Sequence, residues 1–144
     1  MVWNDTYENG TIKAVGRNKG KQAATEELKT AGAPVKILLT TDRPNLKNNW
    51  DDVAYVTASV VDANGIVCPN ETREIQFGIT GSGVIAAVDN ADRTSHEPYQ
   101  VTQRQTYKGW CVALVKAKAS TGAIHIKAST PGLASDSIVI NAKP

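Results

Sequence analysis

The sequence predicts an all-β domain folded as a two-sheet Greek-key sandwich, and three observations support that fold class. The first is composition: the chain has 14 Val, 10 Ile and 14 Thr against 6 Leu, 1 Met and 1 Phe. Because β-branched side chains fit a pleated sheet and lose rotamer freedom in a helix, this composition favours strands over a helical bundle. The other two observations are short segments with strand periodicity and the turn residues that separate them. With 144 residues, the chain is long enough for one domain of ordinary size.

About seven short strands are predicted between residues 35 and 144. In the clearest of them, residues 54–60, an apolar residue occupies every second position. It is followed by Asn64-Gly65, a strong tight-turn signal. Ser120-Thr121-Gly122 predicts a short hairpin connection between two of the later strands. The predicted strands are residues 35–41, 54–60, 75–79, 84–88, 110–118, 123–129 and 135–141.

Residues 1–34 show a different pattern. Segments 11–16 and 22–29 flank Asn18-Lys19-Gly20-Lys21, which predicts a single β-hairpin. A lone hairpin is marginally stable in water and needs something to pack on. Residues 30–34 are typical of a linker, so the chain is predicted to hold one complete domain at 35–144, preceded by part of another.

Charge and hydropathy limit the classes of partner. The 16 basic and 14 acidic side chains give a formal net charge of +2, too small for a nucleic-acid-binding surface. No apolar stretch approaches the length of a membrane span, and the first residues lack the basic and apolar regions of a signal peptide. The sequence therefore predicts neither a nucleic-acid partner nor membrane insertion.

A succession of motifs resembles part of a known enzyme family. The motifs include Leu39-Thr40-Thr41-Asp42-Arg43-Pro44, Asn64-Gly65 with Cys68-Pro69, and Tyr107-Lys108-Gly109-Trp110-Cys111. In this order they resemble the C-terminal immunoglobulin-like domain of family 2 glycoside hydrolases, the multidomain β-galactosidases and β-glucuronidases. Residues 7–15 resemble the end of the accessory β-sandwich that precedes it. Family members often carry Gly and Pro where this chain has Ala91 and Arg93, so a different backbone is expected after Val88.

The resemblance implies a non-catalytic accessory module of a bacterial, exported β-galactosidase-like enzyme, located in the periplasm or outside the cell. Residues 1–34 would then be the C-terminal hairpin of a preceding sandwich plus a linker, and residues 35–144 an immunoglobulin-like sandwich. Retaining glycosidases of this type cleave with two carboxylates from a (β/α)8 barrel. The sequence shows no alternation of strands and helices, and a barrel needs roughly 250 residues. No catalytic residue, metal ligand or cofactor is therefore assigned, and the expected partners are sister domains.

Polar residues are densest in the segment from Asp89 to Glu97. A calcium loop or a catalytic set around His96 can be drawn from them, but the segment lacks an Asp-x-Asp-x-Asp-Gly pattern and a nucleophile. Asp, Asn, Ser and Thr side chains also hydrogen-bond nearby backbone, so a structural role in a long loop is preferred. Cys68 and Cys111 leave two alternatives open, one disulfide or two buried thiols.

Aromatic side chains are the candidates for carbohydrate or interdomain contacts, because sugars stack their apolar faces on exposed rings. Trp50, in a polar loop, is the best carbohydrate candidate, whereas Trp110 begins an apolar strand and is expected to cover the core or a neighbouring domain. Trp3 and Tyr7 are expected to pack on the rest of the hairpin's parent sandwich. An independent carbohydrate-binding module and an invasin-like surface or adhesion domain remain alternatives. The candidate contact residues are Trp50, Trp110, Tyr99 and Tyr107.

Overall fold

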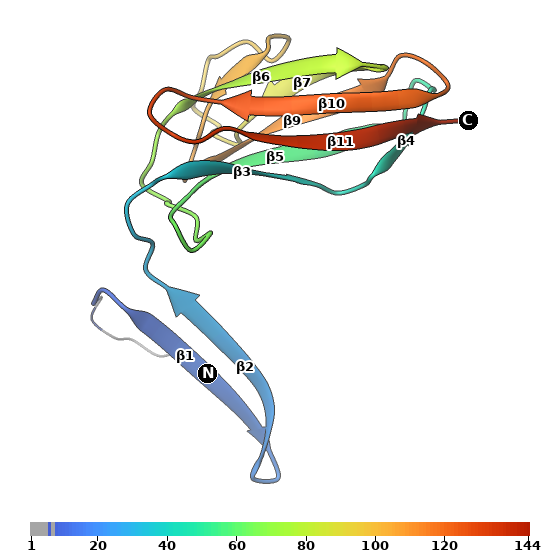
Figure 1. The fold of residues 1–144 in the computed structure, drawn as a ribbon. Coiled ribbons are helices and arrows are strands. Elements are labelled where there is room, and N and C mark those ends of the chain that lie inside the picture. The colour runs from blue at the N-terminus through green and yellow to red at the C-terminus, as the bar shows by residue number, and fades with distance from the viewer. Residues whose placement is uncertain (1–5, 7) are drawn as a thin grey trace.

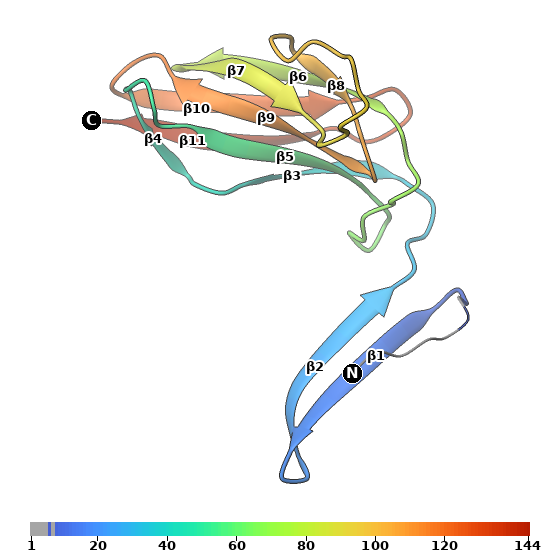
Figure 2. The ribbon, with the colours of Figure 1, turned by 180° about the vertical axis from the view of Figure 1, so that it is seen from behind.

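The computed structural model describes Thr6 and residues 8–144, and every regular element in that part of the chain is a β-strand. A long two-stranded hairpin projects from a sandwich of two sheets (Figures 1 and 2). The all-β, immunoglobulin-like prediction is confirmed. The expectation for Trp3 and Tyr7 concerns residues outside the described part. Over the described residues, no helix has the length and apolar character needed to cross a membrane.

The hairpin consists of β1 (Thr11–Asn18) and β2 (Lys21–Lys29), paired antiparallel from Thr11 opposite Lys29. The two residues of its turn, Lys19 and Gly20, both have positive φ, at 48° and 80°. Two successive positive φ angles are the mark of a type I′ turn, whose twist matches that of the strands it joins. The Asn18-Lys19-Gly20-Lys21 signal therefore predicted this element correctly.

The sandwich packs a five-stranded sheet, in the order β4-β11-β10-β6-β8, on a four-stranded sheet, in the order β3-β5-β9-β7. Successive strands repeatedly cross from one sheet to the other, as in a Greek key. Most pairs are antiparallel, and β4 runs parallel to β11 at the edge. The strands are β3 (Lys36–Thr41), β4 (Asn45–Lys47), β5 (Ala54–Val61), β6 (Glu74–Gly81), β7 (Gly83–Asp89), β8 (Gln103–Gln105), β9 (Trp110–Ala117), β10 (Gly122–Ser129) and β11 (Asp136–Lys143).

Two details differ from the sequence prediction. The segment Ser120-Thr121-Gly122 is not a hairpin connection, because β9 and β10 lie in different sheets and do not pair. Both strands have one apolar face, and a turn between the sheets allows both faces to meet in the core. In addition, β4 and β8 were missed. Each has three residues and a single buried side chain, Leu46 or Arg104, which is too little to show a period.

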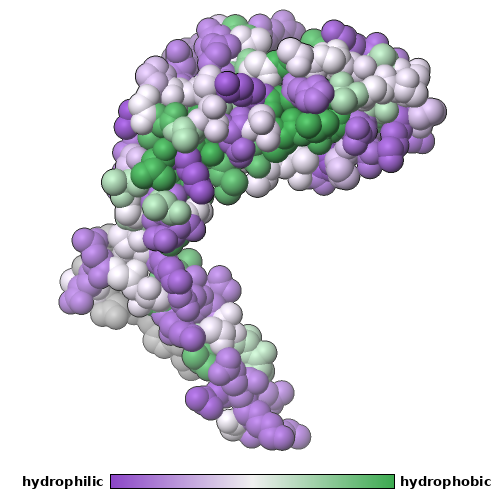
Figure 3. All heavy atoms as spheres, viewed as in Figure 1, coloured by the Kyte–Doolittle hydropathy of each residue, from purple (hydrophilic) through white to green (hydrophobic). Residues whose placement is uncertain are grey.

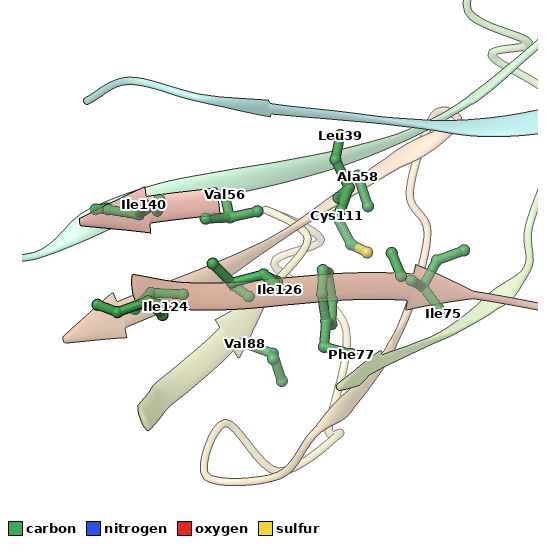
Figure 4. Packing of buried hydrophobic residues seen from close by; sticks show 14 of the residues in the cluster. Leu39, Val56, Ala58, Ile75, Phe77, Val88, Cys111, Ile124, Ile126 and Ile140 are labelled. Carbon is green, nitrogen blue, oxygen red and sulfur yellow. The ribbon is translucent and has the colours of Figure 1, made fainter. Parts of the chain in front are cut away.

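The core lies between the two sheets (Figure 4). Along β5 the predicted alternation is complete, since Ala54, Val56, Ala58 and Val60 are all fully buried. The facing sheet contributes Phe77 and Ile126, among others. Cys68 and Cys111 are both buried and free, so the structure has two thiols and no bridge between them. Burial raises the pKa of the Cys111 thiol to about 12 and also raises that of Cys68.

Candidate interaction surfaces

The four aromatic candidates do not form one site. Trp50 lies in the loop between β4 and β5 and is 85% exposed. Tyr99 lies in the loop before β8, with its ring 5.2 Å from the Arg104 guanidinium carbon. Tyr107 and Trp110 are neighbours in a turn at the start of β9, where the Tyr107 amide donates to the Trp110 carbonyl at 2.9 Å. The Trp50 carbonyl accepts from Lys116, at the other end of β9, so Trp50 and Trp110 lie roughly 20 Å apart.

The loop around Trp50 is held by a set of charged hydrogen bonds. Arg43 donates through Nη1 to Asp52 at 2.7 Å and through Nε to Asp42 at 3.2 Å. The other Asp52 oxygen accepts from the Lys47 amide at 2.7 Å, and the Asp52 amide donates to the Asn49 side chain at 2.8 Å. The Lys47 amide, followed by Arg43, lowers the pKa of Asp52. These contacts fix the backbone on both sides of Trp50.

The outer surface of the four-stranded sheet carries several apolar side chains among polar ones. Strand register places Trp110 opposite Ser59 and Leu114 opposite Tyr55. On the other sheet the outward positions are mainly polar or charged, with Val139 as an exposed exception. Exposed apolar side chains gathered on the outside of a sandwich mark a contact surface. The exposed and half-buried side chains of this face, here named the apolar sheet face, are Leu38, Tyr55, Val84, Trp110, Val112 and Leu114.

The polar segment after β7 surrounds a buried arginine that the sequence analysis missed. The Arg104 side chain is fully buried, and it donates to the Asn90 side chain at 3.1 Å and the Glu97 carbonyl at 3.0 Å. The carboxylates of Asp89 and Glu97 lie 3.5 and 3.6 Å from its nitrogens. Its Nε atom is buried without a hydrogen-bond partner among the described residues. The guanidinium thus supplies the positive charge at the centre of the cluster.

The remaining polar side chains of this segment hold the loop. Thr94 donates to Asp92 through both its amide and its hydroxyl, which lowers the pKa of Asp92. Among Thr6 and residues 8–144, no group of three or more His, Cys, Asp or Glu side chains is arranged to hold a metal ion. Ala91 has a φ of 61°, a left-handed conformation that glycine adopts more readily.

The hairpin leaves much of its own surface uncovered. Every residue of β2 is exposed, and the cross-strand pair Ile12 and Leu28 is 60% and 67% exposed. Near the linker this pair lines an open pocket of about 490 Å³, which also includes Ala31, Val67 and Pro69. Figure 3 shows the described part of the hairpin as mainly hydrophilic with a few hydrophobic residues, whereas larger hydrophobic areas occur on the sandwich.

The linker is fixed to the sandwich through Asp62. This carboxylate accepts from the Gly32 amide at 2.8 Å through one oxygen, and from the Asn64 and Ile66 amides at 2.9 Å through the other. The Gly32 amide, then that of Ile66, lowers the pKa of Asp62. Ala31 packs against the core next to this contact.

The family model for the glycoside hydrolase family 2 (GH2) C-terminal domain 5 matches residues 37–139, which is nearly the whole sandwich. The chain belongs to this family. The match begins within β3 and ends within β11, so the hairpin lies outside it. The resemblance deduced from the motifs is therefore confirmed.

Three relatives show how small a part of a GH2 protein this domain represents. The chain is 33% identical over 143 residues to a β-galactosidase of Bacteroides ovatus, covering 99% of this chain and 17% of that protein. It is 26% identical over 143 residues to a β-glucuronidase of Formosa agariphila, covering 98% of this chain and 14% of that protein. The structure of a GH2 member from Bacteroides cellulosilyticus matches with a TM-score of 0.90 and 33% identity, covering 100% of this chain and 19% of that one. The chain therefore spans less than a fifth of the length of these relatives.

Proposed function

We propose that this GH2 C-terminal domain is a non-catalytic module of a longer bacterial glycosidase, and that it acts by packing against sister domains. The main support for the proposal is the difference in length between this chain and its relatives. Nearly all of this chain matches proteins of which it spans only 14–19%. The two uncovered surfaces support it. Both the apolar sheet face and the hairpin expose side chains that another domain would bury.

The hairpin is proposed to complete a preceding sandwich. Residues 1–34 would be the C-terminal hairpin of that sandwich plus the linker, and residues 35–144 the terminal domain. The exposed strand edges and the Ile12–Leu28 pair support this division, because a two-stranded hairpin gains stability when further strands join it. Such contacts would position the catalytic domain, shape substrate access or support an oligomer.

The longer protein is proposed to be a retaining β-galactosidase that is exported to the periplasm or the cell exterior. The higher identity to a β-galactosidase than to a β-glucuronidase supports the choice of substrate. In a retaining enzyme two carboxylates about 5 Å apart act as nucleophile and acid/base, and a barrel domain would supply them.

Hydrolysis assays on two proteins test this proposal. The purified 144-residue chain should release no chromophore from a chromogenic β-galactoside, whereas the polypeptide extended into its upstream domains should hydrolyse it. A chromogenic β-glucuronide, used in parallel, should be a poor substrate. Turnover by the short chain, or a preference of the extended protein for the glucuronide, would contradict the proposal.

A further inference from the structure

The loop between β4 and β5 (residues 48–53, here named the Trp50 loop) differs from the apolar sheet face in its surroundings. Trp50 has the highest exposure of the large hydrophobic side chains in the described part of the chain. Its sequence neighbours are Asn48, Asn49, Asp51 and Asp52, all of which form hydrogen bonds readily. Trp110, in contrast, lies on a sheet, on the same face of β9 as Val112 and Leu114. The surroundings of Trp110 are those expected at a domain interface. Those of Trp50 suit a polar ligand that carries hydroxyl groups.

The loop is preorganised. Asp52 joins Arg43 to the Lys47 amide, and Lys116 donates to the Trp50 carbonyl from β9. Since these contacts already order the backbone, a ligand that stacks on the indole ring does not have to order the loop first. Preorganisation of this kind raises affinity by lowering the entropy lost on binding.

Polar groups beside Trp50 remain available to a ligand. Lys47, Asn49, Asp51 and Asp52 line an open hollow of about 300 Å³, at the lower end of the size range of ligand sites. Within the described residues, no hydrogen bond occupies the Asp51 carboxylate or the side-chain NH2 of Asn49. Trp50 lies in the sequence between Asn49 and Asp51, two of these lining residues, so one short loop carries both an exposed indole and unoccupied donors and acceptors.

We propose that the Trp50 loop binds neutral pyranosides, lactose among them. The apolar C–H face of the sugar would stack on the indole, and its hydroxyls would donate to Asp51 and accept from Asn49. Three basic side chains, Arg43, Lys47 and Lys116, balance three acidic ones, Asp42, Asp51 and Asp52. This balance offers no net attraction to an anionic uronate, so the ligand is neutral. The site does not depend on what the longer protein hydrolyses.

Fluorine NMR of the 144-residue chain labelled with 5-fluorotryptophan tests the proposal directly. The chain has three tryptophans, Trp3, Trp50 and Trp110, so three resonances can be assigned by single Trp→Phe substitutions. Titration with lactose should shift the Trp50 resonance saturably and leave the other two in place. Methyl β-glucuronide should bind at least about fivefold more weakly. No saturable shift at Trp50, equal shifts at all three residues, or equal binding of the glucuronide would overturn the proposal.

Variants followed through backbone amide shifts supply the controls. Trp50→Ala should abolish lactose binding, and Asp51→Ala should weaken it at least about threefold. Both residues are exposed, so neither change disturbs the core. Trp110→Phe should bind lactose like the unmodified chain, and a loss of binding in this variant instead of Trp50→Ala would place the ligand elsewhere. Because the short chain is used throughout, a negative result leaves the hydrolysis test of the longer protein unaffected.

Discussion

Arg104 is the residue on which the region around the β7–β8 loop depends. It is fully buried yet charged, and its nitrogens meet Asn90, the Glu97 carbonyl and two carboxylates. A buried guanidinium is tolerated when its donors are used, and a partner left behind by its removal is costly. Three residues of the 89–97 segment, Asp89, Asn90 and Glu97, therefore surround this cation, while the others hold the loop.

Replacing Arg104 by Met keeps a long side chain and removes the donors. The Glu97 carbonyl and the buried Asn90 side chain would each lose a charged donor, although Asn90 keeps the Asp92 amide. The carboxylates of Asp89 and Glu97 would also lose their cation, so we expect the free energy of unfolding to fall by about 3 kcal/mol. Urea denaturation of the variant and the unmodified protein measures the change in the free energy of unfolding. Gln103→Ala, an exposed change on the same strand, should lie within about 0.5 kcal/mol of the unmodified protein. Equal effects of the two substitutions would show that the Arg104 contacts contribute nothing.

Ala91 offers a stabilising change. It holds a left-handed φ of 61°, which is unfavourable for a residue with a Cβ atom, and it is exposed. Ala91→Gly should therefore raise the free energy of unfolding, by roughly 0.5–1 kcal/mol. Thermal or urea denaturation would show the gain. A loss of stability would mean that the loop does not adopt this conformation in solution.

At the scale of elements, strand prediction succeeded where a side-chain period was long enough to see. The burial along β5 follows the sequence alternation residue by residue, and the hairpin turn follows from Lys19-Gly20. Pairing was less predictable. Ser120-Thr121-Gly122 is as short as a hairpin loop, and only the packing of both apolar faces into one core shows that it crosses between sheets. The short edge strands β4 and β8 carry no period at all.

The candidate site residues, like the strands, could be predicted only where a local sequence pattern marks them. Trp50 stood out because a tryptophan in a polar segment is conspicuous, and its exposure fits that prediction. Arg104 could not be found in this way, since it lies between two glutamines and its partners are 7 to 15 residues away in the chain. Its burial results from tertiary packing, which no local pattern records.

The turn after β5 and the linker are coupled through Asp62, and this coupling depends on pH. Amide donors lower the pKa of Asp62 in the folded chain. Its carboxylate therefore stabilises the fold at pH values above the ordinary Asp pKa of about 3.9, and that stabilisation is lost as the pH falls through the lower folded value. Asp62→Asn places an NH2 group against an amide donor, so this variant should melt at a lower temperature than the unmodified protein at pH 7.

Melting temperatures of both proteins between pH 7 and pH 2 test the prediction. The difference should begin to shrink near pH 4, where Asp62 of the unfolded chain takes up a proton, and should be lost as the pH falls through the lower pKa of the folded chain. Asp51→Asn is a suitable control, because the Asp51 carboxylate accepts no hydrogen bond within the described residues. If the melting temperatures of Asp62→Asn and the unmodified protein differ by the same amount at every pH, the charged Asp62 carboxylate does not stabilise the fold.

At the scale of the whole molecule, the chain combines a sandwich with its own core and a hairpin that adds nothing to that core. Among the residues that the structure describes, the core cluster lies between Ile37 and Ala142, and the residues of β1 and β2 are almost entirely exposed. The hairpin should therefore open easily in the isolated chain, because few buried contacts protect its backbone hydrogen bonds. We propose that other domains of a longer GH2 protein cover this hairpin.

Hydrogen exchange of the β1–β2 amides, compared between the 144-residue chain and the polypeptide extended upstream, tests that claim most directly. Amides of β5 and β9 serve as the internal reference, because both strands form the centre of one sheet and should be protected in both proteins. We predict rapid exchange of the hairpin in the short chain and at least about tenfold slower exchange in the extended protein. Equal exchange of the hairpin in the two proteins would contradict the account.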